Sequence, residues 1–234
     1  MQAGRRAAGT GAGPELSTDP AYSEDAALFA QPPQHVARPV ARVVLLCGPS
    51  GSGKTSLTRR LGVPVLPLDD SYRDGDDVGT VPAMPHRFGI VDWDHPDSWD
   101  VDAAMAALIR LAASGSTQVP VYDIPGSRRT GTTRLDLDEA PLVLAEGIFA
   151  AHLVQRCRDA GILADALCLT LRPTVTFWRR LARDLSESRK PPATLVRRGV
   201  ALLRAEPALI RRWVELGCRP VTPAQAEAAV RALL

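Results

Sequence analysis

Apolar residues follow two patterns along the chain. Continuous apolar runs occur at five places, and such runs are typical of strands that are buried on both faces of a parallel sheet. The predicted strands cover residues 42–47, 63–68, 119–122, 141–145 and 164–171. Elsewhere apolar residues recur with helical spacing, as at Val101, Met105 and Leu108. The predicted helices cover residues 54–61, 97–113, 149–160, 174–187, 193–204, 207–216 and 223–233.

Strands therefore alternate with helices over most of the sequence. This alternation predicts an α/β fold in which helices flank a mainly parallel sheet. Residues 1–40 are rich in Gly, Ala and Pro, which predicts a flexible N-terminal arm with a short helix near residues 24–30. We expect one domain over residues 41–234, with a hairpin excursion at the Gly/Arg/Thr-rich loop of residues 125–133.

Two helix starts can be predicted from capping residues. Asp97 or Ser98 is expected to cap the helix that begins there, because either side chain can accept a hydrogen bond from the first turn. Thr222 and Gln225 have the spacing of a capping box, and Pro223 occupies the first position of the last predicted helix.

Composition excludes several classes of protein. The 234 residues are 45% hydrophobic and carry a net charge of +2, which fits a globular chain and not a disordered tail. The sequence has no apolar stretch long enough to span a bilayer and no secretory signal, so we expect a cytoplasmic protein that does not bind membranes. The cysteines, at Cys47, Cys157, Cys168 and Cys218, lack C-x-x-C spacing and are expected to be reduced thiols without zinc.

Charge is distributed unevenly. Residues 69–102 contain ten Asp and two Arg, a net charge of −8, whereas residues 172–219 have a net charge of +8. The two segments could be solvated faces that attract each other weakly. They could also form a cleft that binds a hydroxyl substrate on one side and a polyphosphate on the other.

The first predicted strand ends in the sequence GPSGSGKT at residues 48–55, which matches the phosphate-binding motif G-x-x-x-x-G-K-[ST]. Its glycines let backbone N–H groups turn around a phosphate, and the helix that follows adds its N-terminal partial positive charge. Lys54 is expected to reach the β- and γ-phosphates, and the Thr55 hydroxyl to bind Mg²⁺. This motif predicts nucleotide binding.

Several nucleotide-binding classes are disfavoured. A guanine-specific switch protein carries an Asn-Lys-x-Asp base reader, and this chain contains no Asn. The Ser-Gly-Gly-Gln signature of ABC-type ATPases is also missing. A small-molecule phosphotransferase and a nucleotide-dependent regulator remain.

Asp69 follows the second predicted strand. The carboxyl ends of parallel strands line the ligand crevice, so Asp69 is expected beside the phosphate-binding loop. A carboxylate there can accept the proton of a hydroxyl that attacks the γ-phosphate. The alternative is an aspartate that only caps the loop.

Five sequence blocks follow one another along the chain. They are the loop of residues 48–55, Asp69-x-x-Tyr72, Asp94-His95-Pro96-Asp97, Pro120-Val121-Tyr122-Asp123, and Glu146-Gly147-Ile148 followed by Arg179-Arg180-x-x-Arg183-Asp184. In these blocks and their order, the chain resembles the uridine kinase family of P-loop kinases, which includes the phosphoribulokinase relatives, from about residue 43 to residue 190. The resemblance implies a P-loop NTPase fold like that of nucleoside monophosphate kinases, with a helical lid at about 174–192 and a helical C-terminal segment at about 193–234. It also implies phosphorylation of a nucleoside 5′-hydroxyl with ATP, or alternatively GTP, and Mg²⁺.

The resemblance also implies roles for individual residues. The catalytic residues would be Asp69 as general base, Lys54, Arg179 and Arg183. The residues expected to bind ATP are Gly48, Pro49, Ser50, Gly51, Ser52, Gly53, Lys54, Thr55, Ser56 and Arg180. The acceptor would contact Asp69, Tyr72, Asp94, Tyr122, Ser127 and Arg129. Thr55 and Glu146 would hold the metal ion.

One departure from the family concerns the acceptor. After Tyr122-Asp123, uridine kinases continue with an aromatic residue and then a His that help to hold the pyrimidine, whereas this chain has Ile124 and Ser127. Another alcohol, such as a sugar, a pantothenate-like compound or ribulose phosphate, therefore remains an alternative acceptor. A nucleotide-binding regulator is a third hypothesis. We expect a small-molecule partner and no nucleic acid, and a homo-oligomer is left open.

Overall fold

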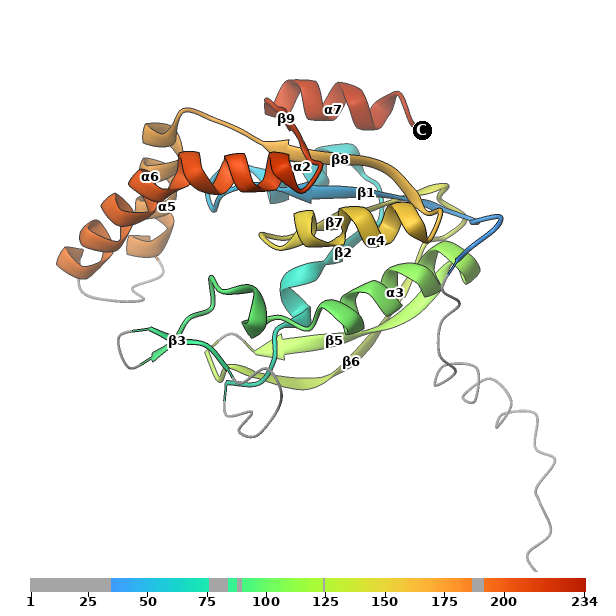
Figure 1. The fold of residues 1–234 in the computed structure, drawn as a ribbon, viewed down its shortest axis with the longest axis horizontal. Coiled ribbons are helices and arrows are strands. Elements are labelled where there is room, and N and C mark those ends of the chain that lie inside the picture. Colours follow the sequence, from blue (N-terminus) through green and yellow to red (C-terminus); the bar gives the residue numbers. More distant parts are fainter. Residues whose placement is uncertain (1–34, 76–83, 88–89, 124, 187–191) are drawn as a thin grey trace, which may run out of the picture. The chain divides into compact units, whose positions relative to one another are not determined.

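The computed structural model describes residues 35–75, 84–87, 90–123, 125–186 and 192–234 (Figure 1). At its centre is a five-stranded sheet of order β2-β7-β1-β8-β9, in which every neighbouring pair is parallel. The strands are β1 (Arg42–Cys47), β2 (Val65–Pro67), β7 (Leu142–Glu146), β8 (Leu163–Leu169) and β9 (Arg219–Val221). The predicted α/β fold with a mainly parallel sheet is confirmed.

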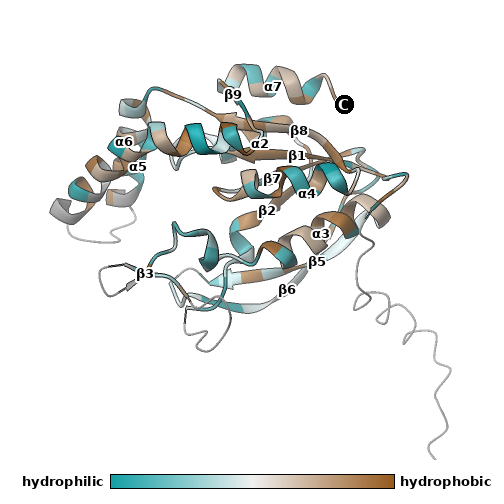
Figure 2. Cartoon of the chain, in the orientation of Figure 1, coloured by the Kyte–Doolittle hydropathy of each residue, from teal (hydrophilic) through white to brown (hydrophobic). Residues whose placement is uncertain are grey.

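Strand β1 shows why the sheet is encoded by continuous apolar runs. Val43 and Leu45 pack into the core on one face of the sheet, and Val44 and Leu46 pack into the core on the other. All four side chains are fully buried. Figure 2 shows the hydrophobic colour along β1, β7 and β8. Burial on both faces leaves no solvent-facing position where a polar residue would produce alternation.

Helices cover both faces of the sheet. One core cluster includes side chains of α3 (Val101–Ser114), α4 (Val154–Asp159) and α6 (Pro192–Glu215), and the other includes side chains of α2 (Lys54–Leu61) and α7 (Pro223–Arg231). Helix α5 (Pro173–Ser186) packs along α6. The expected capping box at the start of α7 is present, since Thr222 accepts from the backbone of Gln225 and the Gln225 side chain accepts in return.

A long antiparallel hairpin stands apart from the central sheet. It pairs β5 (Ser116–Asp123) with β6 (Arg128–Asp136), so the expected hairpin excursion is confirmed. Strand β5 is longer than the strand predicted at residues 119–122, and it is not part of the parallel sheet that its buried run had suggested. Nearly all of β6 is exposed, so its pairing depends on backbone hydrogen bonds that leave little apolar signal. A second small pair, β3 (His86–Arg87) with β4 (Ile90–Val91), was not predicted.

The predicted start of the helix at residue 97 is wrong. Residues Pro96–Ser98 form a short 3₁₀ turn, and α3 begins at Val101 with Asp100 as its cap, whose Oδ1 accepts from the Ala103 amide at 2.9 Å. The cause is Trp99, which is extended and buried, and whose indole N–H donates to the Leu68 carbonyl at 2.7 Å. This long-range bond interrupts the helix before Asp100.

The two helices predicted at 193–204 and 207–216 are one. Helix α6 runs without a break from Pro192 to Glu215, with Pro207 inside it. A proline removes one intrahelical donor and usually ends or kinks a helix. Here Leu195, Glu206 and Trp213 are buried along one side of α6, and this packing retains the helix through Pro207.

Smaller differences concern the edges of elements. The strand predicted at 63–68 is limited to β2 and is followed by a 3₁₀ turn, η1 (Leu68–Ser71). The helix predicted at 149–160 begins with a 3₁₀ turn, η3 (Ala150–Leu153), before α4. Strand β9 was missed because two of its three residues are exposed.

The segment that precedes β1 contacts the domain. Val36 is buried, and its amide donates to the Ala160 carbonyl at 2.9 Å, while the Val40 amide donates to the Ala112 carbonyl at 2.8 Å. The remainder of the expected arm, residues 1–34, and its expected helix at 24–30 lie outside the described residues. Among the helices that the structure describes, none has the length and apolar character needed to cross a membrane.

Candidate active site

The phosphate-binding motif forms the loop between β1 and α2. Gly53 precedes α2 with φ 94°, a left-handed conformation that favours glycine. Gly51 has φ 87°, and a Cβ there would lie 2.8 Å from the backbone oxygen of Thr176. The loop can therefore approach α5 this closely only because residue 51 has no side chain.

A pocket of about 520 Å³ opens at this loop, at the carboxyl ends of β1, β2 and β7. It is lined by Ser50, Gly51, Gly53, Lys54, Thr55, Ser56, Pro67, Asp69, Glu146, Gly147, Ile148, Arg179 and Arg183. The structure thus brings together the predicted catalytic and metal-binding residues from four segments of the chain. A second hollow, of about 620 Å³ between the end of α2 and the end of β6, contains none of the predicted site residues.

Lys54 is near two carboxylates, those of Asp69 and Glu146. Its Nζ donates to the Gly48 carbonyl at 2.8 Å, which holds the ammonium across the loop. Burial lowers the pKa of Lys54, and the charges of Asp69 and Glu146 oppose that decrease. Arg183 lowers the pKa a little further. The loop therefore presents a cation whose nearest charged neighbours are the two acidic residues predicted to act in the reaction.

Asp69 is the second residue of the 3₁₀ turn that follows β2, and it lines the pocket. Although part of its surface is accessible, the protein atoms around the carboxylate remove enough water to raise the pKa of Asp69. Lys54 and the backbone N–H of Ile148 oppose this increase. The next strand end passes close by, because a Cβ at Gly147 would lie 3.0 Å from the Asp69 carboxylate. Asp69 is thus a carboxylate beside the phosphate loop with an elevated proton affinity.

Glu146 and Thr55 contact each other near Lys54. The Thr55 hydroxyl donates to Glu146 Oε1 at 3.5 Å, a long hydrogen bond. Glu146 Oε2 is buried and has no hydrogen-bond partner among the described residues. Burial raises the pKa of Glu146. An unpartnered oxygen beside a hydroxyl fits Mg²⁺, which proteins commonly bind through one or two carboxylates and the phosphates of the substrate. The described residues contain no group of three or more His, Cys, Asp or Glu that could hold a metal ion.

The three arginines of α5 divide between two environments. Arg179 and Arg183 line the pocket. Arg180 is only 7% exposed and donates from Nη2 to the Ser50 carbonyl at 2.8 Å, behind the loop. Arg180 was predicted to bind ATP directly, but the structure does not place it in the lining of the pocket. Trp178, beside them, is 65% exposed.

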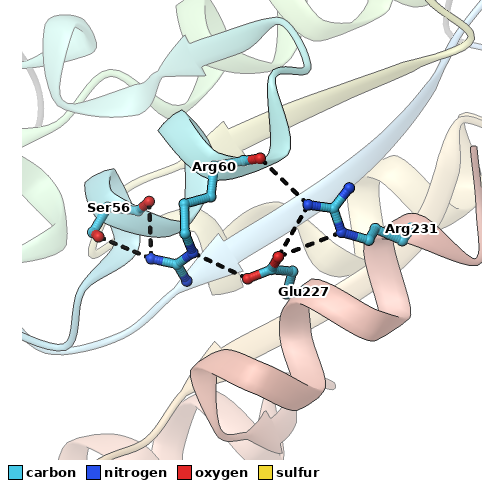
Figure 3. Close-up of polar contacts among 4 residues, drawn as sticks. All are labelled: Ser56, Arg60, Glu227 and Arg231. Carbon is cyan, nitrogen blue, oxygen red and sulfur yellow. Dashed lines mark hydrogen bonds and ion pairs between the residues drawn. The ribbon is translucent and has the colours of Figure 1, made fainter.

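Some residues of the predicted ATP set also support the loop. Within the loop, Ser52 is fully buried, and Gly48 and Pro49 are outside the pocket lining. Ser56 lines the pocket, and its hydroxyl accepts from Arg60 Nη1 at 2.9 Å. Figure 3 shows how Arg60 also donates to Glu227 of α7 at 3.1 Å, and how Arg231 donates to Glu227 at 3.0 Å. Helix α7 thus braces the helix that follows the phosphate loop.

An aromatic cluster lies where the acceptor was expected. Tyr72 and Trp93 meet edge to face with ring centroids 5.5 Å apart, and Tyr122 lies 5.9 Å from Tyr72 and 6.4 Å from Trp93. The Tyr72 hydroxyl donates to the Trp93 carbonyl at 3.1 Å, and the Tyr122 hydroxyl donates to the Arg73 carbonyl at 3.0 Å. Sequence reasoning did not select Trp93 as a site residue, although it directly precedes the predicted substrate contact Asp94.

The other predicted acceptor residues connect loops to each other. The Arg129 amide donates to Asp74 at 2.7 Å, and its guanidinium donates to the Tyr72 carbonyl at 3.1 Å. Ser127 has a left-handed φ of 52°, and its carbonyl accepts from the Gly75 amide at 2.8 Å. Asp94 is exposed. The structure does not place these residues in the lining of the 520 Å³ pocket, and Ile124 lies outside the described residues.

Comparison with known proteins identifies the family. No family model matches the chain. The uridine kinase of Deinococcus deserti is 31% identical over 174 residues, which are 69% of this chain and 77% of that protein. The uridine kinase of Borreliella burgdorferi (strain ZS7) is 30% identical over 154 residues, which are 63% of this chain and 69% of that protein. This chain belongs to the uridine kinase family.

The solved structures agree with the fold of a uridine kinase family member. A provisionally assigned fructose transport system kinase from Silicibacter sp. TM1040 matches with a TM-score of 0.53 and 20% sequence identity, covering 72% of this chain and 85% of that one. That likeness shows the fold alone. The relatives place the chain among P-loop kinases of small molecules.

Proposed function

We propose that the protein transfers the γ-phosphoryl group of ATP to a hydroxyl of a small molecule, with a nucleoside 5′-hydroxyl as the first candidate. The proposal rests chiefly on one observation, which is that Asp69 and the phosphate-loop Lys54 face the same 520 Å³ pocket. Family membership supports the reaction class. GTP is the alternative donor.

Asp69 provides the base in this mechanism. Its carboxylate accepts the proton of the acceptor hydroxyl as that oxygen attacks the phosphorus, and its raised pKa increases its proton affinity. Lys54, which lines the same pocket, attracts the β- and γ-phosphate oxygens. Arg179 and Arg183 are placed to pair with oxygens of the transferring group, which a planar guanidinium does well.

Thr55 and Glu146 would hold Mg²⁺. The ion, when bound, neutralises charge on the phosphate oxygens. The buried, unpartnered Oε2 of Glu146 and the adjacent Thr55 hydroxyl supply the protein oxygens for it. Both residues line the pocket at the phosphate loop, so they also limit where the phosphates can lie.

A different alcohol is the second candidate acceptor. The observation in its favour is that Tyr72 and Tyr122 both donate their hydroxyl protons to backbone carbonyls, and that Arg129 is bonded to Asp74 and to the Tyr72 carbonyl. These groups are thereby committed to the protein. The acceptor could then be an alcohol without a pyrimidine, such as a sugar, a pantothenate-like compound or ribulose phosphate.

An ADP-release assay across a panel of acceptors tests the proposal. Uridine, cytidine, sugars, pantothenate and ribulose phosphate are each added with ATP and Mg²⁺, and the phosphorylated product is identified by mass spectrometry. We expect turnover well above the ATPase background with at least one acceptor. Background rates with every acceptor, together with a salt-dependent shift of the protein on nucleic acid, would instead support a nucleotide-binding regulator.

A further inference from the structure

Helix α6 carries a buried carboxylate in the middle of its packed face. Glu206 is 2% exposed, and it and Arg180 are the two charged side chains that are buried in the described part of the chain. Arg180 Nη2 lies 3.9 Å from Glu206 Oε2. Burying such a pair removes its hydration, and an apolar pair of similar volume is often as stable. Packing alone therefore does not account for a glutamate at this position.

Glu206 binds two residues that lie one turn apart on α5. The Thr176 hydroxyl donates to Glu206 Oε2 at 2.8 Å, and Arg180 faces the same oxygen. Residues four apart share a face of a helix, so both partners point from α5 toward α6. The second carboxylate oxygen, Oε1, is buried and has no hydrogen-bond partner among the described residues. All the polar contacts of this carboxylate thus go to one face of α5.

That same face of α5 supports the phosphate-binding loop. Arg180 Nη2 donates to the Ser50 carbonyl at 2.8 Å. A Cβ at Gly51 would lie 2.8 Å from the Thr176 backbone oxygen and 3.4 Å from the Arg180 backbone nitrogen. The two residues that Glu206 contacts are therefore the two on which Ser50 and Gly51 rest. Because Arg179 and Arg183 extend from the same helix into the pocket, the placement of α5 also sets theirs.

We propose that Glu206 is a positioning residue for the nucleotide site. It acts through Arg180 and Thr176 to hold α5 against Ser50 and Gly51, and so it fixes the loop that binds the phosphates. The inference rests on the proposed function in so far as that function requires ATP. It adds α6, which contributes no residue to the pocket lining, to the elements that determine nucleotide affinity.

The test is Glu206→Gln, which keeps the shape of the side chain and removes its charge. Affinity for ATP with Mg²⁺ is measured by calorimetry, and steady-state kinetics give KM for each substrate. We expect the Kd and KM for ATP to rise about tenfold, within the range of coupling between residues in contact, and the KM of the acceptor to change less than about twofold. Glu215→Gln, an exposed glutamate on the same helix, is the matched control and should bind ATP as the wild type does.

Two further variants separate positioning from stability. Arg180→Gln should weaken ATP binding by itself, and adding Glu206→Gln to it should cost less than about twofold more, since both act along one path. Thr176→Val removes the donor to Glu206 at nearly constant volume and should raise the Kd of ATP, which keeps the test valid if Glu206→Gln fails to fold.

Normal ATP affinity in a folded Glu206→Gln or Thr176→Val variant would overturn the inference, as would effects that multiply in the double variant. A lowered melting temperature with unchanged affinity in the folded fraction would also overturn it, because it would show a purely structural role. Failure of the wild type itself to bind ATP would count against the proposed function and not against the contacts of Glu206.

Discussion

The site has a proposed donor end, at Lys54, Asp69 and Glu146, and a proposed acceptor end, at Tyr72 and Tyr122, and the two are built differently. The donor end collects Lys54, Asp69 and Glu146 from segments at the carboxyl ends of β1, β2 and β7, three neighbouring parallel strands. The acceptor end takes Tyr72 and Tyr122 from a loop and from the separate hairpin. At the donor end opposite charges converge on an open pocket, whereas at the acceptor end polar groups bond to the backbone.

This difference indicates which part of the site is free to change. A substitution at the donor end alters charge in a pocket whose geometry the sheet imposes. A substitution at the acceptor end alters loops that are held together by Arg129, Ser127 and the two tyrosines. A change in the acceptor loops of this chain would therefore leave the geometry around Lys54, Asp69 and Glu146 in place.

Loss of the base should have the largest effect at the donor end. Asp69→Asn is expected to lower turnover about 10²–10⁴-fold, the usual cost of removing a general base, because the amide cannot accept the hydroxyl proton. ATP affinity measured by calorimetry should remain close to that of the wild type. Asp70→Asn, at the neighbouring half-buried carboxylate, is the control and should retain most of the activity. The reverse outcome would assign the base to Asp70.

Loss of the loop cation should come next. Lys54→Ala is expected to lower kcat/KM about 10²–10³-fold, which is typical when one charged contact to the reacting group is removed. The exposed Arg59 on the same helix offers a matched control, Arg59→Ala, which removes a cation outside the pocket. Equal losses in both variants, measured by steady-state kinetics, would show that general electrostatics and not the position of Lys54 matters.

The pH profile of kcat/KM should fall at both its acidic and its basic end, and the range between them should be narrower than the ordinary pKa values of aspartate and lysine would give. Burial raises the pKa of Asp69, so the carboxylate that accepts the proton is lost as the pH falls through a value above the ordinary aspartate range. Burial lowers the pKa of Lys54, so its charge is lost as the pH rises through a value below the ordinary lysine range. Activity should decrease about tenfold per pH unit outside these limits. An acidic limb that persists unchanged in Asp69→Asn would contradict this assignment.

The smallest effects are expected at the acceptor end. Tyr72→Phe and Tyr122→Phe should each change the KM of the acceptor less than about threefold, because both hydroxyls already donate to backbone carbonyls. Each should lower the free energy of unfolding by about 0.5–1.5 kcal/mol, the net value of a hydrogen bond. Denaturant unfolding and kinetics measure the two quantities. A large increase in KM without loss of stability would show that the hydroxyl turns to the acceptor.

The donor end could be predicted almost entirely from the sequence. The motif of residues 48–55 has fixed spacing, and Asp69 follows from the rule that strand ends line the ligand crevice, while the family resemblance implied Glu146. The local determinants of this region agree with its tertiary structure. For the same reason, the capping box at Thr222 was found where the structure has it.

Other features depend on contacts that no local pattern encodes. Asp100 replaces Asp97 or Ser98 as a helix cap because Trp99 bonds to Leu68, which is distant in sequence. Helix α6 continues through Pro207 because the buried residues along one of its sides hold it in place. Glu206 looks like an ordinary solvent-facing glutamate until α5 is seen packed against it. Sequence reasoning failed where a distant partner decides the local structure.

The topology also sets the order in which the site can form. Strand β1 leads into the phosphate-binding loop, yet its two neighbours in the sheet are β7 and β8. They follow it by about 100 and 120 residues, so at a synthesis rate of roughly 5–20 residues per second they emerge about 5–25 seconds later. During that interval neither edge of β1 has its partner strand, a state in which unpaired strand edges favour aggregation. ATP binding would therefore report that a newly made chain has completed its central sheet.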